Sequence, residues 1–290
     1  MKFKKESIVL EFIGYLLLLI SSILAVIYHY PKFYLLFCIS YVLILDHFNY
    51  KLRKESLINN LFSKKHIKST IVFLVGAIVA AFVVDYLFGV RLFHIWLWTN
   101  YTLINWIVLY TLINFAFIIL VYETYRIIEY FLLKRIPEKK IIIKNKLKIQ
   151  MTFIILAIIG FIIPLANFIF FGEKGVNYTM LFPFISIFLL SDAYLTKFKT
   201  PITFNIIKHN RVSIYSILLT SLIIIFTHEF INTFAYQWKY INIPFMQLQV
   251  INIPIAVLIG WIPLILFCIS FVELIVQIDK HKKQYKLLHI

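Results

Sequence analysis

The stretch IQMTFIILAIIGFIIPLANFIFF, residues 149–171, runs for 23 residues without a charged side chain. An α-helix needs about 20 apolar residues to cross the hydrocarbon core of a bilayer, so this stretch predicts a transmembrane helix. Seven further apolar stretches of similar length occur along the 290 residues. We therefore expect an all-α polytopic membrane protein with eight transmembrane helices. They are predicted near residues 8–29, 33–50, 69–90, 101–131, 149–171, 178–197, 211–233 and 252–278.

The composition agrees with this class. The chain is 62% hydrophobic and 14% charged, with only seven glycines, which excludes an ordinary soluble protein. The longest predicted loops have roughly 15 to 20 residues, too few to bury a core of their own, so we expect no soluble domain. The stretch 8–29 follows a basic start and lacks a small-residue cleavage site, so it is expected to remain as an anchor.

The net charge is +16, and the distribution of the basic residues among the loops indicates the orientation in the membrane. Loops on the side of the two termini hold 24 basic residues, and loops on the other side hold four, namely Lys32, Arg91, Lys174 and Lys239. Positively charged loops stay in the cytoplasm, so we expect both termini there. The expected partner of these charges is anionic lipid and not nucleic acid. A bias toward Lys, Ile, Asn and Phe suggests an AT-rich genome, and we expect a multi-pass protein of a prokaryotic cell membrane.

Several kinds of membrane site are missing from the sequence. No lysine falls at mid-membrane depth, which excludes a retinal Schiff base. The eight histidines never recur at the i and i+4 spacing of a histidine-box oxygenase. Asp-x-x-x-Asp and a glycine-rich phosphate loop are also absent. Cys38 and Cys268 lie in apolar runs and are expected to pack in the core. We expect neither a metal nor a cofactor.

Acidic residues inside the predicted spans need a partner or a function, because a charge at the bilayer centre costs about 3 kcal/mol or more. One group lies toward the cytoplasmic end, and we treat it with Arg126 as an inner polar cluster. Its acids are Asp46, Glu123, Asp192 and Glu273. A second group, Asp85 and Glu229, lies toward the outer end.

The spacing of these acids suggests an internal repeat. Asp46 and Asp192 are 146 residues apart, Asp85 and Glu229 are 144 apart, and Glu123 and Glu273 are 150 apart, while half the chain is 145 residues. Each outer acid is followed by an aromatic doublet, Trp96-x-Trp98 or Trp238-x-Tyr240. We expect two four-helix units, residues 1–148 and 149–290, related by an axis along the membrane normal, with a cavity between them.

Structural explanations exist for the same residues. The inner acids Asp46, Asp192 and Glu273 precede basic loops and could pair with Lys51, Lys197 and Lys280. Glu123, Arg126 and Glu129 could neutralise one another along one helix face. The Trp and Tyr doublets fit an outer aromatic belt. No lysine lies within a helical turn of Asp85 or Glu229, so a buried hydrogen-bonded pair and a functional acid are both open there.

The second half carries a family resemblance. Glu229, Trp238-x-Tyr240, Ile253-Pro254 and Gly260-Trp261 resemble a pattern in integral-membrane carotenoid-biosynthesis proteins, chiefly the hydratases of bacterioruberin-type pathways. Membrane lycopene cyclases are similar in general plan, but their glutamate pair is replaced here by Ile255-Ala256-Val257. The hydratase pattern also has an asparagine where this chain has Val257. The resemblance covers about 35 residues well and implies an isoprenoid-processing ancestry more than a named reaction.

The residues suggest how such a reaction would run. Hydration or cyclisation of a polyene begins when an acid protonates a carbon–carbon double bond. Asp85 and Glu229 are the candidate acids, and His94 and His228 are the candidate proton relays. Aromatic faces stabilise the resulting carbocation by up to about 2 kcal/mol each. The candidates for that role are Trp96, Trp98, Trp238, Tyr240 and Trp261.

Two other functions are compatible with the same pattern. Acids inside paired helices and helix breakers at Pro164, Pro183 and Pro263 also describe a solute or proton-coupled transporter or channel. A membrane scaffold whose acids pair with other chains is the third possibility. The sequence leaves the oligomeric state open.

Overall fold

The computed structural model describes residues 2–62, 67–99, 102, 107, 110–137, 141, 143–172 and 179–287. All structural statements below concern these residues. Seven helices are long and apolar enough to cross a membrane. They correspond to seven of the eight predicted spans and lie at Ile8–Val26, Pro31–Arg53, Ile67–Leu92, Thr111–Leu133, Lys146–Phe171, Arg211–Ala235 and Ile255–Ile278. The protein is therefore a multi-pass membrane protein.

The remaining predicted span, residues 178–197, is shorter than the others. It appears as helix α9, Leu181–Leu195, which is apolar but has only 15 residues. The remaining long helices are α1 (Lys2–Val26), α2 (Tyr34–Arg53), α4 (Ile67–Ala80), α6 (Thr111–Leu133), α7 (Lys146–Phe171), α11 (Arg211–Ala235) and α12 (Ile255–Leu287). The predicted start of the fourth span, residues 101–110, falls where the structure describes only Thr102, Ile107 and Tyr110.

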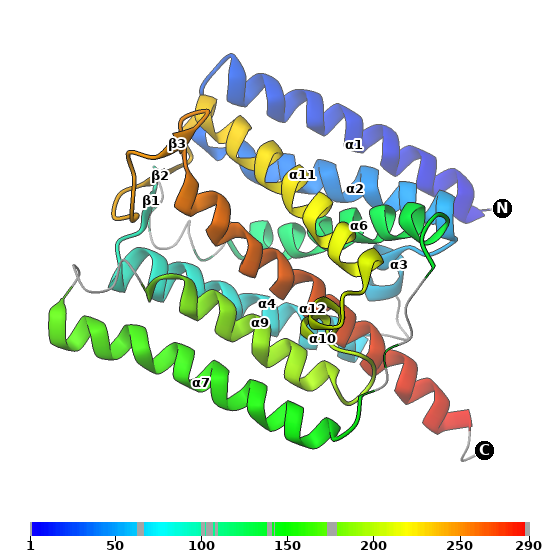
Figure 1. Ribbon diagram of the computed structural model, residues 1–290. Helices are drawn as coiled ribbons and strands as arrows, with labels where there is room; N and C mark the ends of the chain where they lie inside the picture. The colour runs from blue at the N-terminus through cyan, green and yellow to red at the C-terminus, as the bar shows by residue number, and fades with distance from the viewer. Residues whose placement is uncertain are drawn as a thin grey trace.

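The helices form two groups, one of α1, α2 and α6 and one of α7, α9 and α12, and the groups meet where α6 contacts α12 (Figure 1). Helix α1 packs on α2 and α2 on α6, while α7 packs on α9 and α9 on α12. Across the groups, α11 packs on α6, α4 packs on α12, and α6 contacts α12. The start of α1 and the end of α12 lie on the side of the molecule opposite the short strands (Figure 1).

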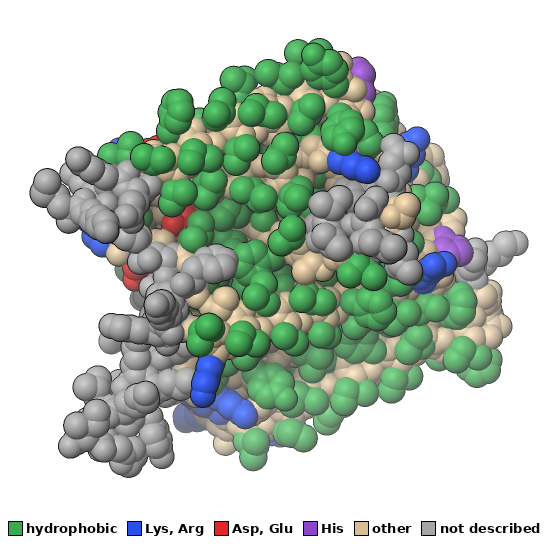
Figure 2. Space-filling model, turned by 180° about the vertical axis from the view of Figure 1, so that it is seen from behind, with side chains coloured by type: hydrophobic (Ala, Val, Ile, Leu, Met, Phe, Trp, Pro, Cys, Tyr) green, Lys and Arg blue, Asp and Glu red, His purple; other side chains and the backbone are tan. Residues whose placement is uncertain are grey.

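The outer surface of the helices is apolar. Phe12 on α1 is 69% exposed and Ile169 on α7 is 75% exposed. Figure 2 shows hydrophobic side chains across most of one face, with few charged groups. Such a surface is unfavourable in water and is expected against lipid tails. Helix α6, by contrast, buries a continuous run from Ala116 to Tyr125 and forms the core with α11 and α12.

Two six-residue helices, α3 (Leu57–Phe62) and α10 (Ile202–Ile207), follow α2 and α9. The carboxylate of Asp46 accepts hydrogen bonds from Ser56 Oγ at 2.7 Å and from the Ile58 amide at 3.1 Å, at the start of α3. Asp192 accepts the Ile202 and Thr203 amides, both at 2.8 Å, at the start of α10. These groups, and not the predicted Lys51 and Lys197, are the partners of the two acids.

Two short antiparallel strand pairs qualify the expectation of a purely helical chain. Strand β1 (Trp96–Trp98) pairs with β2 (Trp238–Tyr240), and β3 (Gln249–Val250) pairs with β4 (Ile253–Pro254). A residue with positive φ lies two positions before each of the first two strands, His94 with φ 48° and Tyr236 with φ 51°. This conformation turns the chain back after a long helix.

The third predicted span has an unusual second half. It continues from α4 as a π-helix, η3 (Ala81–Leu92), which contains Asp85. The π geometry, in which the Phe93 amide bonds the Phe88 carbonyl at 3.0 Å, is rare beyond one turn and is frequent at functional sites. It buries Val84, Asp85, Phe88 and Gly89 on the side that faces the protein.

A candidate active site in an aromatic cavity

A cavity of about 780 Å³ lies between η3, the β1–β2 pair, α6, α9 and α12. Its wall is mainly apolar and aromatic. All five aromatic residues singled out from the sequence line it: Trp96, Trp98, Trp238, Tyr240 and Trp261. The structure thus gathers the predicted aromatic set at one site, from β1, β2 and α12.

Glu229 lies directly behind this wall. Its side chain on α11 is buried, with 2% of the residue exposed. Its Oε1 atom accepts a hydrogen bond from the Tyr240 hydroxyl and one from Trp261 Nε1 at 2.7 Å. Trp238 Nε1 in turn donates to the Tyr240 hydroxyl at 3.0 Å. Both donors to Glu229 fall on the same oxygen, so Oε2 is the oxygen suited to carry a proton.

The surrounding backbone fixes these donors. Asn232, one turn after Glu229, accepts the Trp238 amide at 3.2 Å and donates to the Trp238 carbonyl at 3.0 Å. Gln237 accepts the amide of Tyr34 at 3.2 Å, which ties β2 to the start of α2. Burial, with the charge of Glu229 as a second cause, raises the pKa of Tyr240 well above its usual value. Tyr240 therefore stays a hydrogen-bond donor at physiological pH.

Asp85 lines the same cavity from η3 and is 8% exposed. Arg91, at the end of η3, donates from Nε to the Tyr86 hydroxyl at 2.9 Å. The two outer acids thus adjoin one hollow, Asp85 directly and Glu229 through Tyr240 and Trp261. Glu229 forms no ion pair with arginine or lysine among the described residues.

Trp96 depends on a glycine for its place. A Cβ atom at Gly89 of η3 would lie 2.4 Å from Trp96 Cζ2, closer than real contacts allow. The absence of a side chain at Gly89 therefore lets the indole lie against the π-helix. Trp98 packs edge-on to Tyr110 at 4.6 Å between ring centroids and lies 5.5 Å from Trp238.

The two candidate relay histidines are not in the cavity wall. His228 is fully buried among the rings of Tyr34, Phe37, Tyr41, Phe117 and Trp261. Its Nδ1 lies 2.9 Å from the Ile224 carbonyl, which only accepts hydrogen bonds, so Nδ1 carries the ring proton. His94 is half-buried in the turn before β1. The structure brings neither residue to the cavity surface.

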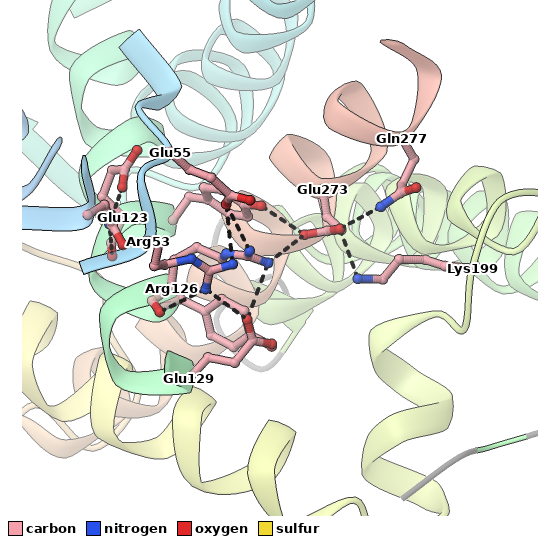
Figure 3. A network of polar contacts seen from close by, with 11 residues as sticks. Arg53, Glu55, Glu123, Arg126, Glu129, Lys199, Glu273 and Gln277 are labelled. Atoms are coloured by element: carbon pink, nitrogen blue, oxygen red, sulfur yellow. Dashed lines mark hydrogen bonds and ion pairs between the residues drawn. The ribbon is translucent and has the colours of Figure 1, made fainter. Parts of the chain in front are cut away.

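The inner polar cluster forms a separate network (Figure 3). Arg126 lies 3.2 Å from Glu129, 3.4 Å from Glu55 and 3.9 Å from Glu273. Glu273 is paired with Lys199 at 2.9 Å and accepts the Tyr122 hydroxyl at 2.9 Å. Lys199 is thus a partner of Glu273 that was not predicted. The side chain of the predicted partner, Lys280, lies outside the described residues.

The predicted triplet of Glu123, Arg126 and Glu129 is only partly present. Arg126 pairs with Glu129, but Glu123 accepts the side-chain amide of Asn49 on α2 instead. Asp192 stands apart from this network and accepts Ser270 Oγ at 3.1 Å in addition to the start of α10. The five residues grouped from the sequence therefore separate into two helix caps, Asp46 and Asp192, an ionic network that contains Arg126 and Glu273, and Glu123, which lies outside that network.

Sequence reasoning missed the supporting residues. Tyr34, Asn49, Asn232 and Gln237 are all buried and polar or aromatic with a polar tip. Amide side chains inside apolar segments are the signal that could have identified Asn49 and Asn232, because buried amides need hydrogen-bond partners. Comparison with known proteins identifies no matching family model, no similar curated protein and no similar solved structure.

Proposed function

We propose that this protein is an integral-membrane enzyme that acts on an isoprenoid or carotenoid-like lipid by acid-initiated hydration or cyclisation. The observation that supports this most strongly is the buried carboxyl group of Glu229, held by Tyr240 and Trp261, two residues that line an aromatic cavity. Polar residues this well enclosed are expensive in a membrane and commonly mark a functional site.

The proposed first step is a proton transfer. Glu229, protonated on Oε2, adds its proton to a carbon–carbon double bond, and the pair of electrons of that bond forms the new C–H bond. The two donors on Oε1 stabilise the carboxylate that remains. Trp238, Trp261 and the other rings of the wall then face the carbocation and lower its energy.

The second step depends on what reaches the cation. In hydration, a water molecule adds to the cation and loses a proton to the Glu229 carboxylate, which restores the acid. In cyclisation, a second double bond of the same polyene attacks the cation, and a neighbouring carbon then loses the proton. Both routes balance without a cofactor. Asp85, on the opposite element of the cavity, is the proposed group that orients water or receives the proton.

We also propose eight membrane crossings, with α9 as the shortest, and both termini in the cytoplasm of a prokaryotic cell. The placement of the start of α1 and the end of α12 on one side supports an even number of crossings (Figure 1). The loops rich in lysine and arginine are expected on the side of the two termini, and such loops stay in the cytoplasm.

A tandem duplication is proposed on the same basis. Helices α3 and α10 start 145 residues apart and are capped by Asp46 and Asp192 in the same way. Helices α6 and α12 start 144 residues apart, as Asp85 and Glu229 do, and this offset pairs Glu273 with Glu129 more closely than with Glu123. The matching contacts of α1 with α2 and of α7 with α9 support two units of four helices.

A proton- or ion-coupled transporter is the second candidate. It is favoured by the ionic network of Figure 3 and by a second cavity of about 570 Å³ beside it, lined by Arg53, Glu55, Arg126 and Glu273 among others. A scaffold subunit is the third candidate, and no specific contact favours it.

The test is expression in a bacterium that accumulates linear polyenes, followed by chromatography and mass spectrometry of the extracted pigments. The proposal predicts a new pigment that carries one added water or is an isomer of the starting polyene. Glu229→Gln should abolish it at unchanged membrane level, and Glu11→Gln, far from the cavity, should not. If the unmodified protein alters no polyene, the enzyme proposal is wrong.

A further inference from the structure

The second cavity holds an acid that the ionic network leaves without a cation. The network contains three cations, Arg53, Arg126 and Lys199, and three acids, Glu55, Glu129 and Glu273, joined by contacts of 2.9 to 3.9 Å. Three positive and three negative charges balance one another. Glu123 is outside this balance, because no lysine or arginine nitrogen among the described residues lies within 4.0 Å of it.

Glu123 is also well shielded from water. It is 3% exposed, and its carboxylate accepts a hydrogen bond from the side-chain amide of Asn49. The carboxylate of Asp46, which accepts a hydrogen bond from Ser56, repels Glu123 more strongly than the more distant Arg53 attracts it, and the Leu57 amide is a further hydrogen-bond donor to Glu123. An isolated charge in such a place is costly unless an opposite charge accompanies it.

Asn49 supplies an independent sign of a missing ligand. It lines the second cavity and is 2% exposed. Its Nδ2 donates to the carbonyl and the carboxylate of Glu123, so the amide orientation is set. The remaining Oδ1 atom is buried and has no hydrogen-bond partner among the described residues. An acceptor left in this state usually has a water or an ion as its partner.

We propose that the cavity beside Glu123 and Asn49 binds one small monovalent cation, such as sodium or potassium. Asn49 Oδ1 and the Glu123 carboxylate are its protein ligands, and the hydroxyl of Tyr122, which also lines the cavity, supplies a third oxygen from the same wall. Oxygen donors of this kind suit hard cations. One added positive charge neutralises the Glu123 carboxylate.

The donor set argues against other ligands. No group of three His, Cys, Asp or Glu side chains within the described ranges could hold a metal ion, which disfavours a transition metal. An anion is disfavoured because Arg53 and Arg126 are already bridged by Glu55 and Glu129. A proton on Glu123 would remove its charge but would leave Asn49 Oδ1 without a donor, so it explains only one of the two observations.

The test is thermal unfolding of the full-length protein in detergent, followed by tryptophan fluorescence. The buffers contain sodium, potassium or N-methylglucamine chloride at equal ionic strength. A cation that binds only the folded state should raise Tm by roughly 3 to 6 °C at ten times its Kd, with a saturable dependence on concentration. Glu123→Gln should remove this rise, and Asn49→Leu should weaken the apparent affinity at least tenfold.

Glu11→Gln is the control, because it removes a carboxylate that pairs with His47 and is not part of this cavity. It should keep the response to the cation. Equal Tm values in all three salts would overturn the proposal and indicate that a proton on Glu123 is sufficient. A cation response that survives in both Glu123→Gln and Asn49→Leu would overturn it as well. Neither result bears on the Glu229 site, which is at the other cavity.

Discussion

Leu97 and Lys239 face each other at the centre of the β1–β2 pair, with Trp96 opposite Tyr240 and Trp98 opposite Trp238 on either side. The aromatic residues point to one face of this ribbon and line the cavity, while Leu97 and Lys239 point outward and are exposed. The pairing is symmetric about its central residues, because Trp96 and Trp238 are the first residues of their strands. A two-residue alternation thus brings both aromatic doublets to one site.

The donors to Glu229 provide the first prediction. Tyr240→Phe and Trp261→Phe each remove one hydrogen bond to Oε1 and keep an aromatic ring. A hydrogen bond to a charged group contributes about 1.5 to 3 kcal/mol, so the rate of polyene conversion should fall roughly 10- to 100-fold in each variant. The measurement is initial rate in membranes with matched protein content.

Tyr236→Phe is the control for this pair. Tyr236 is 57% exposed and lies just before β2, outside the cavity wall. It should convert polyene at the unmodified rate. Equal losses in all three variants would indicate a general effect on folding and not on the acid.

Gly89→Ala tests the contact between η3 and Trp96. The new methyl group would lie 2.4 Å from Trp96 Cζ2, so the indole must move into or out of the cavity. Overpacking of this kind costs about 1 to 3 kcal/mol. We expect a lower Tm and a changed product profile. Gly172→Ala is not a suitable control because its φ is 62°, but Gly260→Ala meets only Leu181 at 3.5 Å and should lower Tm less.

The two helix-capping aspartates should differ in importance. Asp192→Ala leaves the amides of Ile202 and Thr203 and the hydroxyl of Ser270 without an acceptor, whereas Asp46→Ala affects Ser56 and Ile58. Each unsatisfied buried group costs about 1 to 3 kcal/mol. Unfolding measured by fluorescence should show the larger loss for Asp192→Ala. Glu11→Ala, which removes a partly exposed pair with His47, should cost less than about 1 kcal/mol.

The topology can be checked by cysteine labelling. Cys38 and Cys268 are buried, so the unmodified protein should give little background with a membrane-impermeant maleimide. Lys239→Cys should react in intact cells, while Lys54→Cys and Lys208→Cys, both exposed in the structure, should react only after the cells are opened. Reaction of Lys54→Cys in intact cells would reverse the proposed orientation.

Hydropathy was enough to locate the long helices, because lipid contact imposes apolar stretches of a fixed length. It did not reveal that Asp85 sits in a π-helix, since hydrogen-bond register within a helix has little effect on composition. The sequence also pointed to the five aromatic residues of the cavity wall, yet it suggested lysines as the partners of Asp46 and Asp192. Helices of six residues, which start eleven residues after Asp46 and ten after Asp192, are too short to show an apolar period, so backbone amides were not considered as partners.

Contacts between the two groups of helices set the order in which the Glu229 site is completed during synthesis. Helix α4 contacts α12, which follows α11 in the chain, and Trp261 on α12 is one of the donors to Glu229. During synthesis the acid of α11 therefore enters the bilayer before its ring partner exists. The cavity wall is complete only after α12 has been made, so a product that stops before α12 holds the Glu229 carboxyl group without one of its two donors.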